Sequence, residues 1–78
     1  MPTVLRWNGH RFYFFSNEGN EPPHIHIDKG GASAKFWLSP VELARNIGYS
    51  ERELNALRRK VEEEAASFEE AWRAYFGG

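Results

Sequence analysis

Hydrophobic and polar side chains alternate along the first half of the chain, and this period of two predicts β-strands. The alternation falls in four segments, residues 3–7, 10–15, 24–28 and 33–38. Asn8-Gly9 separates the first two segments, and this dipeptide favours the positive φ angles of a two-residue hairpin turn. Such a turn places Trp7 opposite His10. An uninterrupted register then places Val4 opposite Tyr13. We therefore expect an antiparallel sheet of three to four strands.

In the second half of the chain, the apolar residues recur every three or four positions, which is typical of a helix. Ser50 and Glu53 form the sequence pattern of a capping box in front of a long C-terminal helix, residues 51–76. A second pattern of this kind, Ser39-Pro40-Val41-Glu42, predicts a short helix over residues 40–47 that ends at Gly48. The fold class expected is α+β, with both helices covering one face of the sheet.

The composition limits the classes of protein to consider. A chain of 78 residues is expected to form a single domain, residues 1–78. It has no cysteine, which excludes disulfides and thiolate metal sites, and its net charge of −1 argues against a strong, general binder of polyanions. No run approaches the ~20 apolar residues of a membrane span, and no signal peptide is recognisable. We expect a cytoplasmic protein with no membrane partner.

The strand alternation sorts the side chains of the sheet into two faces. One face is almost wholly apolar and should be covered by the helices: Leu5, Phe12, Phe14, Ile25, Ile27, Ala34, Phe36 and Leu38. The other mixes cations, imidazoles and aromatic rings, and should form one open surface: Arg6, Arg11, Tyr13, Phe15, His24, His26, Asp28, Lys35 and Trp37. Three interpretations of this second face compete, namely a solvated or partner-covered face, a nucleic-acid surface, and a metal site.

The most function-like segment is Pro22-Pro23-His24-Ile25-His26. Two residues apart on a strand, both imidazoles point to the same face. They are candidate catalytic residues, one as base and one as acid, for RNA cleavage that needs no metal and no other cofactor. The candidate nucleic-acid-binding residues around them are Arg6, Arg11, Tyr13, Lys35 and Trp37.

The same two histidines could instead ligate a metal ion. A metal site needs at least a third ligand, and Asp28, Glu18, Glu21 or His10 could supply it, although none lies at a diagnostic spacing. With Asp28 as the third ligand, the alternative metal site consists of His24, His26 and Asp28. The residues leave open whether the protein is an enzyme.

Most of the chain resembles a family of small bacterial proteins, the domain of unknown function 4160. The resemblance rests on residues 1–6, on the string Ser16-Asn17-Glu18-Gly19…Glu21-Pro22-Pro23-His24-Ile25-His26, and on residues 34–38. It implies a bacterial, cytoplasmic protein, and a gene paired with that of another small protein in the manner of toxin–antitoxin modules. The leading hypothesis is therefore a component of such a module that binds RNA, with RNA cleavage as its further expected activity. The partners to consider are a co-encoded small protein, RNA or DNA, and a second copy of the chain. A non-enzymatic interaction protein is the alternative.

Overall fold

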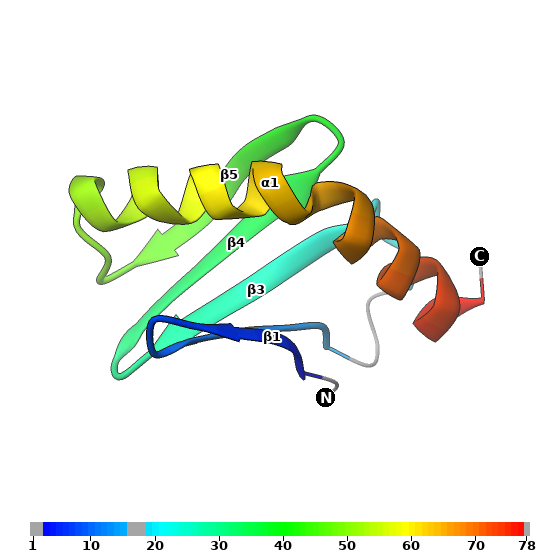
Figure 1. Ribbon diagram of the computed structural model, residues 1–78, viewed down its shortest axis with the longest axis horizontal. Helices are drawn as coiled ribbons and strands as arrows, with labels where there is room; N and C mark the ends of the chain where they lie inside the picture. Colours follow the sequence, from blue (N-terminus) through cyan, green and yellow to red (C-terminus); the bar gives the residue numbers. More distant parts are fainter. Residues whose placement is uncertain (1–2, 16–18, 78) are drawn as a thin grey trace.

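The computed structural model describes residues 3–15 and 19–77, and it contains a five-stranded antiparallel sheet with one long helix packed on one face (Figure 1). The α+β class is therefore confirmed, with five strands where the sequence predicted three to four. The strands are paired in chain order, so that β1 and β5 are the two edges. The elements are β1 (Thr3–Trp7), β2 (His10–Tyr13), β3 (His24–Lys29), β4 (Ala32–Leu38), β5 (Val41–Ile47) and α1 (Glu51–Phe76).

The first hairpin forms at the predicted turn. Asn8 and Gly9 have φ angles of 51° and 81°, and Trp7 pairs with His10. Further along, Tyr13 pairs with Thr3, so the predicted pairing of Tyr13 with Val4 is wrong. A bulge between Thr3 and Leu5 causes the shift. The bulge lets two consecutive side chains, Val4 and Leu5, both pack against the core.

Residues 40–47 do not form the predicted helix; most of this segment is strand β5. Ser39 and Pro40 form the turn after β4, and Leu43 then pairs with Phe36. Val41 and Leu43, two positions apart, both pack against the core, which is the spacing of a strand. Pairing with β4 along the whole segment outweighs the local capping pattern, because secondary-structure propensity is weaker than tertiary context.

The long helix begins and ends as predicted. The Glu53 amide donates to the Ser50 hydroxyl at 3.1 Å, and the Ser50 amide donates to the Glu53 carboxylate at 3.0 Å. At the other end Gly77, with a φ of 73°, donates its amide to the Arg73 carbonyl at 2.8 Å. Each end of α1 is thus capped by local hydrogen bonds.

The core lies between α1 and one face of the sheet, as Figure 1 shows. The predicted apolar face is confirmed: its residues are buried, except Leu5, which is partly buried. Leu57, Val61, Phe68 and Trp72 are the buried residues of α1. Among the described residues, no helix combines the length and apolar character needed to cross a membrane.

Candidate functional site

Four side chains lie in one row across the sheet face opposite α1. Tyr13 on β2 pairs with His26 on β3, His26 pairs with Lys35 on β4, and Lys35 pairs with Arg45 on β5. Directly paired residues of antiparallel strands share a face, so the row runs from aromatic to imidazole to cation to cation. Trp37, two residues after Lys35 on the same strand, belongs to the same face.

His26 lies inside a cluster of rings. Its imidazole stacks on Tyr13 with 5.4 Å between centroids and meets the Phe15 ring edge-on at 4.5 Å. Only 4% of its surface is exposed. Tyr13, at 5%, is buried as well. The prediction that this face forms one open surface is therefore wrong at these positions, because the rings cover one another.

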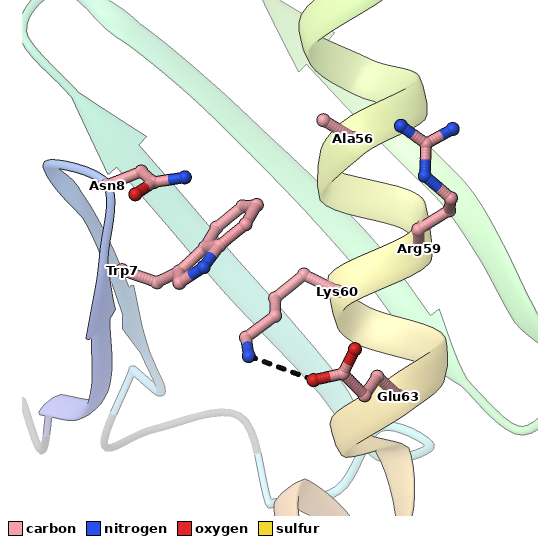
Figure 2. A pocket seen from close by; sticks show the side chains of 6 residues that line it. All are labelled: Trp7, Asn8, Ala56, Arg59, Lys60 and Glu63. Carbon is pink, nitrogen blue, oxygen red and sulfur yellow. Dashed lines mark hydrogen bonds and ion pairs between the residues drawn. The ribbon is translucent and has the colours of Figure 1, made fainter.

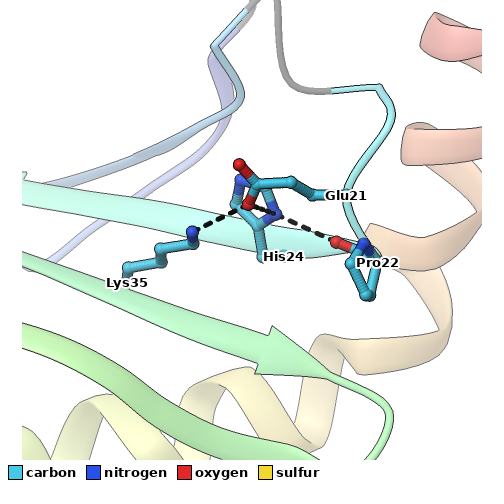
Figure 3. Close-up of polar contacts among 4 residues, drawn as sticks. All are labelled: Glu21, Pro22, His24 and Lys35. Atoms are coloured by element: carbon cyan, nitrogen blue, oxygen red, sulfur yellow. Dashed lines mark hydrogen bonds and ion pairs between the residues drawn. The ribbon is translucent and has the colours of Figure 1, made fainter.

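His24 is fully buried, at 0% exposure. The indole of Trp72, from the C-terminal part of α1, lies 4.8 Å from its ring, and the Trp37 indole lies 5.5 Å away. Its Nδ1 hydrogen-bonds the Pro22 carbonyl at 3.0 Å (Figure 3). Because a carbonyl oxygen only accepts, Nδ1 carries the hydrogen in this arrangement. The sequence could not show this burial, since it depends on where α1 ends in space.

Glu21, which immediately precedes the two prolines, contacts residues of the same face. The Glu21 carboxylate accepts from Lys35 Nζ at 2.9 Å, and the same oxygen lies 3.8 Å from His24 Nδ1 (Figure 3). Lys35 Nζ also lies 4.5 Å from the centre of the Trp37 ring. The lysine is therefore held in place by a carboxylate and a ring, with 17% of its side chain exposed. The sequence had proposed Glu21 only as a metal ligand.

An open pocket of about 360 Å³ lies at the β5 end of the row. It is lined by His26, Lys35, Trp37, Ala44 and Arg45. Arg45 was missed as a site residue because residues 40–47 were predicted to be helical. The signal that could have found it is the alternation of Val41 and Leu43, which marks a strand whose other face carries charge.

The remaining predicted residues lie toward the β1 edge. The Arg11 guanidinium lies 4.5 Å from the centre of the Tyr13 ring, and its Nε donates to Thr3 Oγ1 at 2.7 Å. The Tyr13 hydroxyl donates to Asp28 Oδ2 at 3.0 Å. Arg6 is exposed and pairs with Arg11. These side chains share the face but do not line the pocket.

For the alternative prediction of a metal site, residues 3–15 and 19–77 contain no assembled set of ligands. This part of the chain brings together no group of three His, Cys, Asp or Glu side chains that could hold a metal ion. Asp28 is bound by Tyr13, and His10 lies in a separate contact with Tyr49. Glu18, another proposed ligand, lies outside the described residues.

His10 joins the hairpin to the segment before α1. Its Nδ1 lies 2.9 Å from the Tyr49 hydroxyl, and Trp7 stacks on its ring. Both partners of this bond are buried. Burial raises the pKa of Tyr49 to about 12 and, together with the charge of Lys29, lowers the pKa of His10. These shifts favour the neutral form of both groups.

A second pocket, of about 500 Å³, lies between the first hairpin turn and α1 (Figure 2). It is lined by Trp7, Asn8, Ala56, Arg59, Lys60 and Glu63. Lys60 Nζ lies 5.5 Å from the Trp7 ring and donates to Glu63 and Glu64 at 3.1 and 3.3 Å. The lining of this pocket thus includes a carboxylate, Glu63, that is bound to Lys60, whereas the lining of the first pocket contains no carboxylate.

The described residues thus form an α+β fold with a five-stranded antiparallel meander and one helix. The cationic pocket lies on the sheet face opposite the core, which we call the helix-free face. The chain belongs to the family described as domain of unknown function (DUF4160), whose model matches residues 9–73. No curated protein and no solved structure matches it.

Proposed function

We propose that the protein binds single-stranded nucleic acid, RNA first of all, in the pocket on the helix-free face of its sheet. The observation that carries the proposal is the row of His26, Lys35 and Arg45 beside the indole of Trp37. Proteins that bind single strands combine cations for the phosphates with a ring on which a base stacks. Lys35 and Arg45 supply the first element and Trp37 the second.

The charge of this pocket is local. The whole chain has a net charge of −1, yet the pocket lining holds two cations and no carboxylate. Two acids lie outside the lining: Glu21, which accepts from Lys35, and Glu42, which pairs with Trp37 on β4. A phosphate that enters the pocket competes with Glu21 for the lysine, so the affinity should be moderate and should fall as salt is added.

The burial of the two histidines argues against their acting as an acid–base pair in RNA cleavage. A general acid or base must come within hydrogen-bond distance of the atom whose proton it transfers. His26 lines the pocket, whereas His24 lies behind it against Trp72. We therefore assign contact with the strand to His26 and positioning of the His26 ring to His24. Binding, rather than cleavage by a pair of histidines, becomes the primary activity.

The test is the affinity for a labelled single-stranded RNA, measured by fluorescence anisotropy. Lys35→Ala and Arg45→Ala should each weaken binding, and each should reduce the slope of log K against log salt by about 0.7, the value for one lost phosphate contact on a single strand. Trp37→Ala should weaken binding by roughly 1–3 kcal/mol without changing that slope.

Arg52→Ala is the matched control, because Arg52 is an exposed cation on α1 that does not line the pocket. It should bind as the wild type does. Equal affinity of all the variants, or no binding by the wild-type protein, contradicts the proposal. Incubation of the RNA with His26→Ala and His24→Ala also tests cleavage, since an acid–base pair requires that both variants lose it.

A second candidate function is docking of a co-encoded partner in a two-gene module of the toxin–antitoxin kind. It is favoured by the C-terminal turns of α1, which reach beyond the strand ends in Figure 1 and carry Tyr75 with 45% of its surface exposed. Coexpression with the product of the neighbouring gene tests it. The complex should purify with wild-type protein and be weakened by Tyr75→Ala. Independent purification of the two chains argues against it.

A further inference from the structure

Strand β5 is an edge of the sheet whose far side has no strand partner in the described part of the chain. Most of its residues are exposed: Glu42, Ala44, Arg45, Asn46 and Ile47. An uncovered edge presents backbone donors and acceptors that a further strand can use. A strand that pairs here must also match the side chains along this edge.

The pairing of β5 with β4 shows on which face each β5 side chain lies. Glu42 pairs with Trp37 and Arg45 pairs with Lys35. Trp37 and Lys35 are two positions apart and therefore share a face, so their partners share it too. In a regular strand, residues 42 and 45 would point to opposite faces. The register shift opposite Lys35 and Phe36, which leaves Ala44 without a direct partner, brings both charges to the helix-free face.

We propose that two copies of the chain pair antiparallel through β5 and form a continuous ten-stranded sheet. In the register centred between Leu43 and Ala44, Glu42 of one copy lies opposite Arg45 of the other, and the two-fold symmetry creates this pair twice. Directly opposed residues of antiparallel strands share a face, a requirement that Glu42 and Arg45 meet only because of the bulge. A second copy is therefore the partner whose charges match this edge.

The exposed Ile47 supports the same register. It is one of two large hydrophobic side chains exposed in the described residues, at 53%. The register that pairs Glu42 with Arg45 places Ile47 beside Pro40, which is also exposed, in the turn of the other copy. An apolar side chain that is costly to leave in water gains an apolar neighbour at each end of the interface.

A bulge on an edge strand usually discourages pairing with an unrelated strand. Two copies carry the same bulge at the centre of the proposed register, so both strands bend at the same point. The bulge thus excludes unlike strands and tolerates its own. The dyad is perpendicular to the sheet, which places both α1 helices on one face and both pockets on the other.

The test is the oligomeric state, measured by sedimentation velocity over a range of protein concentrations. The wild-type protein should sediment as a species of about twice the 9.0 kDa of one chain. Glu42→Arg and Arg45→Glu each place like charges opposite one another in both pairs, and each should raise the dimer dissociation constant at least about tenfold. The double variant Glu42→Arg/Arg45→Glu restores opposite charges and should recover the dimer.

Glu62→Arg and Arg52→Glu are matched controls, because they reverse the same charges at exposed positions on α1. They should remain dimers. A monomeric wild type, single variants that dimerise normally, or a double variant that stays monomeric each overturns the proposal.

The dimer does not rest on the proposed nucleic-acid binding, although Arg45 takes part in both. Lys35→Ala separates the two, since it should weaken RNA binding and leave the dimer intact. Glu42→Arg should break the dimer while the pocket lining is retained.

Discussion

At the scale of single residues, buried polar groups carry the strongest constraints in this protein. His10, His24 and His26 are all buried, and the structure gives His10 and His24 hydrogen-bond partners of their own. A buried polar group that loses its partner keeps the cost of leaving water. The contact of His10 with Tyr49 is the clearest case, because it joins segments 39 residues apart in the chain.

Tyr49→Phe removes the hydroxyl and leaves His10 Nδ1 without this partner. We expect the free energy of unfolding to fall by about 1–3 kcal/mol, the cost of an unsatisfied buried group. Urea unfolding followed by circular dichroism measures it. Tyr75→Phe is the control, since it removes the hydroxyl from an exposed tyrosine and keeps its ring. Equal stability of Tyr49→Phe and wild type contradicts the importance of the bond.

The lowered pKa of His10 gives the stability a pH dependence of definite sign. Folding lowers the pKa of His10 below its ordinary value of 6.5, so the unfolded state binds more protons just below that pH. Its contribution is therefore present above pH 6.5 and is lost as the pH falls from there through the folded pKa. Urea midpoints measured across this range should decline in wild type and decline less in His10→Gln.

Tyr49 should act at the opposite end of the pH scale. Its pKa rises from 10.0 to about 12 on folding, so the folded state keeps its proton longer than the unfolded state. The stabilisation is complete below pH 10 and is lost between pH 10 and about 12. In Tyr49→Phe, the urea midpoint of unfolding should stay nearly constant over this interval. If the midpoint still declines as it does in wild type, other groups cause the loss of stability at alkaline pH.

At the scale of elements, the sequence predicted the features that depend on the chemistry of neighbouring residues. The Asn8-Gly9 turn and the Ser50–Glu53 capping box each depend on neighbouring residues, and both are present. Residues 40–47 show the limit. Their capping pattern is local, whereas the pairing of β5 with β4 is not, and the non-local term decided the structure.

The turn between β5 and α1 provides a test of this corrected element. Gly48 has a φ of 85°, and a Cβ there would lie 3.4 Å from the backbone of Ala32. Gly48→Ala should lower the free energy of unfolding by about 1–2 kcal/mol, the cost of a left-handed conformation for an L-residue. Gly31→Ala is the control, since nothing lies within 4 Å of a Cβ at that position. Equal effects in the two variants would contradict the turn described here.

At the scale of the whole molecule, the packing of α1 determines which side chains are accessible to a ligand. The sequence predicted the two faces of the sheet correctly, and it predicted that both histidines point away from the core face. It could not predict that α1 brings Trp72 against His24, nor that β5 adds Arg45 beside Lys35. The candidate site therefore moved from the two histidines toward β4 and β5, where cations and an indole line a pocket.

The three tryptophans allow the central claim to be tested in one titration. Each indole N–H gives its own NMR signal, and the three lie in different places: Trp37 in the proposed binding pocket, Trp7 in the second pocket, and Trp72 in the core. On addition of single-stranded RNA to ¹⁵N-labelled protein, the Trp37 indole and the amides of Lys35 and Arg45 should shift together. The Trp7 indole should not move. Shifts confined to Trp7 and α1, or no shifts at all, would contradict binding at the helix-free face.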